Sequence, residues 1–225
     1  MKKIIFFAIC LLIAGSVSAQ GYYYGPRRVV RRPVHRADDD FYKVRAGITG
    51  GLNIADVFDA NNYNYRTASI AGFNAGFFLD IPIAFPLSFA PEVLYSQKGY
   101  ATSTPDGNFT QRSNYVDVPL LAKFKLGPNF NFLIGPQVCF PLSTTNTYGN
   151  GFVITDEQYY NTSNSGTVMD GVIGVTFDLG RNVELRARYT VDLSQNNTLN
   201  NNNNGYYPTD YRNEVWQIGL GFKFE

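Results

Sequence analysis

The chain has 225 residues, of which 19 are Lys or Arg and 18 are Asp or Glu. This near balance gives no global attraction to polyanions, so we do not expect nucleic-acid binding. Aromatic residues make up 16% of the chain and charged residues only 16%. No segment beyond the first 20 residues comes near the roughly 18 apolar residues that a spanning helix needs, so membrane-spanning helices are not expected.

The first 19 residues have the three zones of a secretory signal peptide. Two lysines precede an apolar run over 4–13, and small residues follow up to Val17-Ser18-Ala19. Because the apolar run is too short for a transmembrane anchor, we expect cleavage between Ala19 and Gln20. The remaining chain would keep a single cysteine, Cys139, and therefore no internal disulfide.

Residues 20–41 show no hydrophobic periodicity. Five arginines and His35 lie between Arg27 and Arg36, and three aspartates follow at 38–40. The arginines could contact phosphates, but a basic block next to its own acidic block is more typical of a solvated tail. We predict a flexible, arginine-rich linker.

From residue 42 onward, apolar and polar residues alternate with a period of two, which is typical of β-strands with two different faces. In the clearest case, apolar residues from Val183 to Leu193 alternate with Glu184, Arg186, Arg188, Thr190 and Asp192. Eight such segments are found, at 44–54, 71–80, 87–98, 115–126, 130–142, 169–179, 183–193 and 215–225.

The segments are longer than the usual soluble strand of about 5–6 residues and match a tilted strand that crosses a bilayer. The connections between them alternate in length: short at 81–86, 127–129 and 180–182, and long at 55–68, 99–112, 143–166 and 194–212. Short periplasmic turns and long outer loops are typical of outer-membrane barrels. We therefore predict an all-β domain over 42–225, an eight-stranded antiparallel up-and-down transmembrane β-barrel in the outer membrane of a Gram-negative bacterium.

Alternation alone does not decide whether the apolar face meets lipid or a protein core. Strand length, aromatic residues at strand ends and glycines on the polar face favour lipid on the outside. A soluble, secreted, lipocalin-like barrel that binds a ligand remains an alternative.

The charges on the polar face nearly balance. Because buried charges are costly unless paired, a balanced set favours an ion-paired interior over a wide pore, with a small passive channel or transporter as the alternative. The candidate interior ion-pair residues are Arg45, Glu92, Asp117, Lys123, Lys125, Asp170, Glu184, Arg186 and Arg188.

The sequence offers little for catalysis. Its one histidine, His35, precedes the predicted barrel, and no metal, nucleotide or dinucleotide motif is present. The carboxylates of Glu92 and Asp117 on neighbouring strands are better explained as structural ion-pair members than as an acid and base. We expect a protein that is not an enzyme, with no cofactor, no metal and no catalytic residue.

Two strand motifs resemble the PorT-like outer-membrane β-barrel family of Bacteroidetes, and the similarity extends over about 43–225. One is Glu-x-x-Tyr-Ser-x-Lys-Gly and the other Tyr-x-x-x-Pro-Leu-Leu, here Glu92, Tyr95, Ser96, Lys98, Gly99, Tyr115, Pro119, Leu120 and Leu121. The resemblance implies an eight-stranded barrel but no single activity, since only a few members are tied to secretion or gliding machinery. We expect a monomer in outer-membrane lipid that acts as a structural or interaction protein, whose outer loops or arginine-rich linker contact an unidentified protein or envelope partner.

Overall fold

A computed structural model describes residues 41–58, 67–104, 107–150, 153–163, 166–193 and 212–224. The chain divides into two compact units, Met1–Arg36 and Ala37–Glu225, and every described residue belongs to the second. The predicted signal peptide with Ala19 and Gln20, the linker up to residue 40, and residues 194–211 of the Asn-rich last loop lie outside the described residues.

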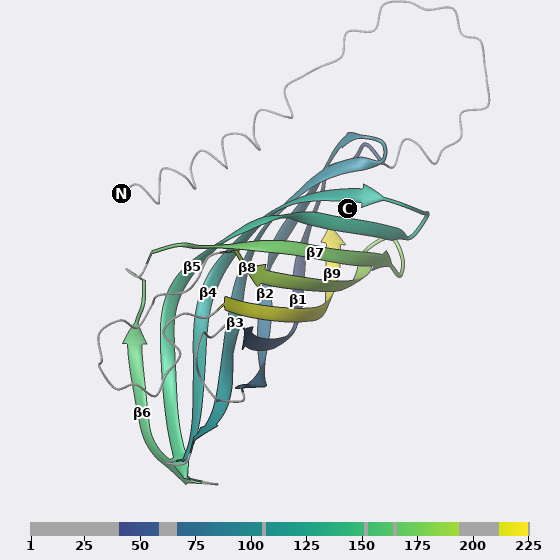
Figure 1. The fold of residues 1–225 in the computed structure, drawn as a ribbon. Coiled ribbons are helices and arrows are strands. Elements are labelled where there is room, and N and C mark those ends of the chain that lie inside the picture. Colours follow the sequence, from purple (N-terminus) through teal and green to yellow (C-terminus); the bar gives the residue numbers. More distant parts are fainter. Residues whose placement is uncertain are drawn as a thin grey trace, which may run out of the picture. The chain divides into compact units, whose positions relative to one another are not determined.

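The described part of the chain forms strands that all pair in antiparallel fashion (Figure 1). None of its helices is long and apolar enough to cross a membrane. The strands are β1 (Arg45–Phe58), β2 (Thr67–Ala84), β3 (Leu87–Thr104), β4 (Gly107–Lys125), β5 (Phe130–Asn150), β6 (Val153–Asn161), β7 (Val168–Asp178), β8 (Val183–Asp192) and β9 (Arg212–Phe224).

Eight of these strands pair in a closed cycle, in the order β1-β2-β3-β4-β5-β7-β8-β9 and back to β1. The prediction of an all-β, antiparallel, up-and-down arrangement is confirmed. The predicted strand count of eight is wrong, because the described residues contain nine strands. The additional strand, β6, pairs with β5 and with no other strand of the described sheet.

Two predicted long loops are largely strand. β3 and β4 extend through 99–112 and leave only 105–106 between them, while β5 continues to Asn150 and pairs there with β6. We call residues 99–104, 107–114, 143–150 and 153–161 the projecting sheet, which continues β3, β4 and β5 away from β7 and β8 (Figure 1). Its strands were missed because their alternate residues are mostly polar on both faces, so the hydrophobic period of two is lost.

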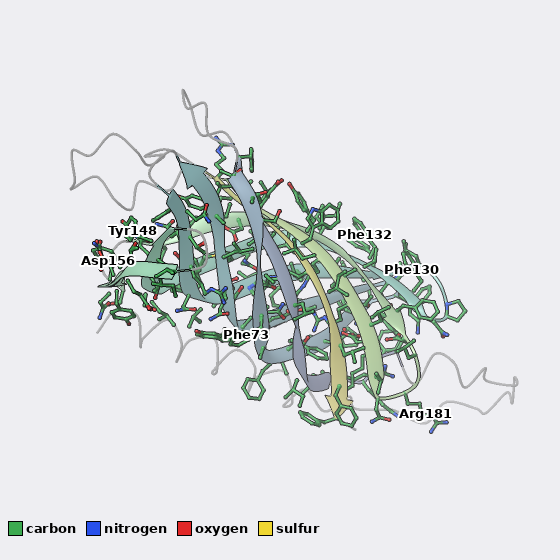
Figure 2. The ribbon with its side chains drawn as sticks, turned by 90° about the horizontal axis from the view of Figure 1, so that it is seen from below. Phe73, Phe130, Phe132, Tyr148, Asp156 and Arg181 are labelled. Atoms are coloured by element: carbon green, nitrogen blue, oxygen red, sulfur yellow. The ribbon has the colours of Figure 1, made fainter. Side chains whose placement is uncertain are left out.

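The short turns lie together at one end of the ring, which we call the turn end. Backbone hydrogen bonds tie neighbouring turns there: Lys125 N to Pro86 O at 2.9 Å, Asp178 N to Asn129 O at 2.7 Å, and Lys223 N to Asn182 O at 2.6 Å. Figure 2 shows Arg181 at this end, with Tyr148 and Asp156 of the projecting sheet at the opposite end, the loop end. The connection predicted at 81–86 is only the two residues 85–86.

Side chains alternate between an exposed outer face and a buried interior. In β8 every second residue from Glu184 to Asp192 is buried. In β9 the apolar side chains from Trp216 to Phe224 point outward, with Ile218 57% exposed, whereas Val215 is buried. Leu52 on β1 and Phe77 on β2 are each 67% exposed. This arrangement is the reverse of a lipocalin-like barrel, which has apolar side chains inside and charges outside.

Candidate functional site

The interior of the ring is crossed by a buried ion-pair cluster. Glu92 on β3 is 2% exposed and accepts hydrogen bonds from the guanidinium groups of Arg186 and Arg188 on β8, the second at 2.7 Å. In the cyclic strand order, β3 and β8 are four strands apart in either direction. These pairs therefore connect opposite walls of the ring.

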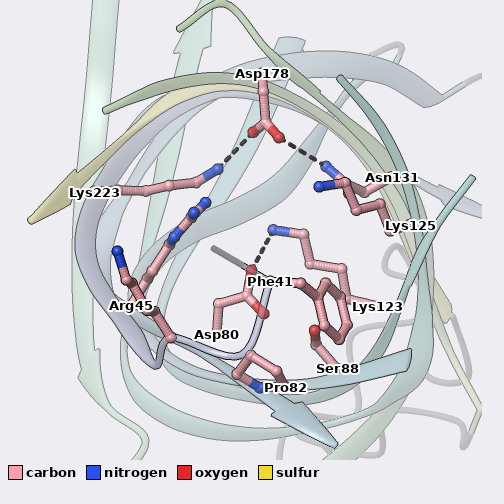
Figure 3. A pocket seen from close by; sticks show the side chains of 11 residues that line it. Phe41, Arg45, Asp80, Pro82, Ser88, Lys123, Lys125, Asn131, Asp178 and Lys223 are labelled. Atoms are coloured by element: carbon pink, nitrogen blue, oxygen red, sulfur yellow. Dashed lines mark hydrogen bonds and ion pairs between the residues drawn. The ribbon is translucent and has the colours of Figure 1, made fainter. Parts of the chain in front are cut away.

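Further charges continue this cluster toward the turn end. Lys123 Nζ lies 2.8 Å from Asp80 Oδ2 and 3.4 Å from Glu184 Oε2, and Lys223 Nζ lies 3.0 Å from Glu184 Oε2. Lys223 also pairs with Asp178 (Figure 3). We call the whole set the turn-end network: Asp80, Glu92, Lys123, Asp178, Glu184, Arg186, Arg188 and Lys223.

A second buried network lies nearer the loop end. Lys98 Nζ is 2.8 Å from Asp170 Oδ2, 3.3 Å from Asp117 Oδ2 and 3.2 Å from the sulfur of Cys139. The Cys139 thiol in turn donates to Asp170 at 3.0 Å. The other members of this loop-end network are Gln137, which donates to Asp170, and Asp192, which lies opposite Asp170 in the strand register and accepts two hydrogen bonds from Asn213.

The nine predicted interior residues separate into three groups. Glu92, Lys123, Glu184, Arg186 and Arg188 lie in the turn-end network, and Asp117 and Asp170 lie in the loop-end network. The carboxylates of Glu92 and Asp117 thus belong to different networks. Arg45 and Lys125 are only partly buried and line a hollow at the turn end.

Lys98 is the central cation of the loop-end network but is not among the predicted interior ion-pair residues. The alternating pattern indicates its position, because Lys98 shares the polar face of segment 87–98 with Glu92 and Ser96. Glu92 and Lys98 are six residues apart on one strand face, which joins the two networks through β3.

Apolar side chains occupy part of the remaining interior. Ala90, Leu121, Leu133 and Val172 form one buried cluster, contributed by β3, β4, β5 and β7. The ring of Phe78 lies under Arg186, with the guanidinium carbon 4.7 Å from the ring centroid, and a side chain at Gly47 would collide with this ring. Toward the loop end, Val57, Tyr100 and Phe109 form a second buried cluster, against which Tyr148 packs.

The described residues contain no group of three or more His, Cys, Asp or Glu side chains placed to hold a metal ion. The buried carboxylates instead contact lysine, arginine and amide groups. The interior therefore contains a set of desolvated ion pairs. Such pairs stabilise one packing of the side chains as long as every partner is present.

Comparison with known proteins gives a family and a fold likeness. The model of the family described as "Outer membrane protein beta-barrel domain" matches residues 35–197. No curated protein matches the chain at a significant level.

Three solved structures are among those similar to the chain. Ail, the attachment invasion locus protein of Yersinia pestis, is 12% identical with a TM-score of 0.47, over 81% of this chain and 99% of that one. Neisserial surface protein A is 16% identical with a TM-score of 0.46, over 80% and 97%. The outer membrane protease OmpT from Escherichia coli is 9% identical with a TM-score of 0.35, over 80% and 96%.

Proposed function

Because the chain belongs to the outer membrane protein beta-barrel domain family, we propose that its 42–225 domain is a closed transmembrane barrel whose wall contains every described strand except β6. We propose that its lumen is plugged by side chains and that it acts as a structural or interaction protein. The predicted location in the outer membrane is confirmed by this membership. β6 would then be an addition to the barrel, outside its closed wall.

The observation that carries the plugged lumen is the pairing of Glu92 with Arg186 and Arg188 across the ring. A conducting path would have to pass these buried groups, so the ion pairs that join opposite walls would have to separate, at the cost of their short hydrogen bonds, before water and ions could pass. This cost favours a plug over a small passive channel. The buried carboxylates contact cationic and amide groups, as expected of structural ion pairs, and we propose a protein that is not an enzyme.

The outer surface of the ring supports contact with lipid. Large apolar side chains on its strands are exposed, among them Ile48, Leu52, Phe77, Ile134 and Ile218. In water, so many exposed apolar side chains would promote aggregation. In a bilayer, an apolar outer surface is what a transmembrane barrel needs to contact lipid. Since the ring strands pair on both sides, the barrel wall has no open edge to join a second copy, and we propose a monomer.

The surface offered to a partner is, in this proposal, the projecting sheet. Short turns of family barrels face the periplasm, so the opposite end, with the projecting sheet, would face outward. One edge of its last strand β6 pairs with no described strand, so its backbone groups can pair with an extended segment of another protein. Val153, Ile154 and Tyr159 on β6 are 65–69% exposed and add apolar contact surface.

We further propose that the chain is cleaved between Ala19 and Gln20 and that residues 20–41 form a flexible linker that is a second contact region. We also propose that the protein binds no cofactor and is related to the PorT-like family. The Glu-x-x-Tyr-Ser-x-Lys-Gly motif, which carries the resemblance, has a structural role. Its Glu92 belongs to the turn-end network and its Lys98 to the loop-end network.

Site-specific photo-cross-linking in intact cells tests the proposed contact surface. A photoreactive phenylalanine analogue at Tyr159, on β6, should give a discrete adduct of higher mass, while the same analogue at Arg181, at the turn end, should not give that adduct. Heat-modifiable migration on SDS gels checks that both variants are folded. Folded protein with no adduct from Tyr159, or the same adduct from both positions, would contradict the proposal.

A further inference from the structure

The strand at the end of the projecting sheet, β6, carries two adjacent carboxylates. Its edge that faces away from β5 pairs with no described strand, and we call it the free edge. Asp156 and Glu157 are both exposed near the middle of this strand. Since consecutive residues of a strand point to opposite faces, each face of the sheet has one carboxylate beside the free edge.

The two carboxylates have different surroundings. Asp156 lies opposite Tyr148 (Figure 2), and Tyr148 lies opposite the buried Phe109, so this face continues the interior of the ring. Asp156 also accepts a hydrogen bond from Gln158 at 2.9 Å. Glu157 points to the opposite, outward face, where it makes no ion pair with any residue that the structure describes. A cation that approaches the free edge can therefore pair with Glu157 without displacing a described partner.

The sequence around β6 supplies no cation to these carboxylates. No lysine or arginine occurs between Lys125 and Arg181. In the described residues of the projecting sheet, the one basic residue is Arg112 on β4, and β5 separates β4 from β6. The backbone of Arg112 is thus about 10 Å from β6, on the side away from the free edge. The charges beside the free edge are therefore both negative.

The regular part of β6 can accept a further strand. From Asp156 to Asn161 its pairing with β5 is uninterrupted, and the register shift between these two strands lies before this stretch, at Tyr148 and Gly149 of β5. An added strand would place one residue directly opposite each residue of this stretch, with Cβ atoms about 4.5–5.5 Å apart. A cationic side chain opposite Glu157 is then close enough to form an ion pair.

We propose that the free edge binds an extended segment of another protein that carries two adjacent basic residues. One of them pairs with Glu157 on the outward face, and the next pairs with Asp156 on the other face. Two positions from the first, the segment has an apolar residue opposite Tyr159, whose side chain is 69% exposed. Cross-strand pairs of opposite charges, and of an aromatic with a β-branched residue, stabilise paired strands. This inference rests on the proposed function, because it names the chemistry of the partner at that surface.

Charge disfavours a second copy of this chain as the occupant. Pairing β6 with β6 of a second copy would bring together two carboxylates from each copy, on strands that contain no lysine or arginine. Like charges on paired strands are destabilising. A basic segment instead neutralises both carboxylates, while its backbone pairs with the free edge.

A short synthetic peptide tests the proposal. It alternates valine and threonine, has two adjacent arginines at its centre and carries a fluorescent label, and its binding to the purified full chain in neutral detergent is followed by anisotropy. Saturable binding is expected, weakened about tenfold in the double variant Asp156→Asn, Glu157→Gln, because two exposed charge contacts are lost. The matched control, Asp56→Asn with Glu214→Gln, removes two partly exposed carboxylates from β1 and β9 and should leave the affinity unchanged.

Two altered peptides separate charge from backbone pairing. Glutamine in place of both arginines should weaken binding about tenfold, for the same reason as the double variant. N-methylation of the central amides should abolish binding, because these amides can no longer donate hydrogen bonds to the free edge. Absence of saturable binding by the arginine peptide, equal affinity of the double variant and the unmodified chain, or unchanged binding of the N-methylated peptide overturns the proposal.

Cross-linking in intact cells distinguishes this inference from the proposal on which it rests. The adduct formed by the photoreactive analogue at Tyr159 should disappear in the Asp156→Asn, Glu157→Gln background. An adduct that persists there, or an adduct with the mass of two copies of the chain, contradicts a basic partner but leaves the contact surface in place. Absence of the adduct from the unmodified background contradicts the contact surface itself, and the peptide titration then decides this inference separately.

Discussion

The variant Glu92→Gln is expected to lose about 3–5 kcal/mol of unfolding free energy, because it leaves two guanidinium groups buried without their shared carboxylate. Arg186 and Arg188 are each 4% exposed. Among the described residues, Arg186 would keep one ion-pair partner, Glu184, whose Oε1 is 3.5 Å from the Nε of Arg186. Urea unfolding in lipid vesicles, followed by the fluorescence of the single tryptophan, Trp216, measures the change.

Two control variants test whether the loss of stability comes from the guanidinium groups left unpaired. Glu157→Gln, on the exposed face of β6, removes one carboxylate from the surface and should change the free energy by no more than about 0.5 kcal/mol. The triple variant Glu92→Leu, Arg186→Met, Arg188→Met removes all three charges and should recover most of the loss, as replacement of a buried ion pair by apolar residues often does. Equal stability of Glu92→Gln and Glu157→Gln would show that the cross-ring pairs do not hold the interior together.

The second large effect is expected on the outer face of the ring. Ile218→Arg places a charge among exposed apolar side chains in the middle of β9 and should cost about 2–4 kcal/mol if that face meets the bilayer interior. Ile154→Arg makes the same substitution on β6, where Ile154 is 65% exposed compared with 57% for Ile218. The β6 variant should lie within about 0.5 kcal/mol of the unmodified protein.

Refolding yield into vesicles, together with urea midpoints from heat-modifiable migration on gels, separates the two variants. Since the two isoleucines have similar exposure, a much larger cost on β9 than on β6 is the result expected if the outer face of the ring meets lipid. Equal costs for Ile218→Arg and Ile154→Arg would argue that the ring has no lipid-facing belt.

The period-two pattern was informative where the two faces of a strand meet different surroundings. In β8 it assigned Glu184, Arg186 and Arg188 to one face, and all three side chains are buried in the ring. In the projecting sheet neither face needs to be continuously apolar, so the pattern disappears while backbone pairing continues. This is why β6 and the outer parts of β3, β4 and β5 were expected to be loops.

The pattern also predicts which face of a strand a side chain lies on, but not its position along the axis of the ring. Lys123 and Lys125 share a face in the sequence, yet Lys123 is buried against Asp80 and Glu184 whereas Lys125 lies at the rim of the hollow. Pairings such as Lys98 with Asp170, 72 residues apart, depend on the register of several strands.

Planar-bilayer recording from the purified, heat-modifiable protein tests the filled interior most directly. If the ion pairs between β3 and β8 block the lumen of the ring, the reconstituted protein should give no channel steps above the baseline noise of the membrane. Steady, large single-channel conductance from the unmodified protein would contradict a lumen plugged by these side chains.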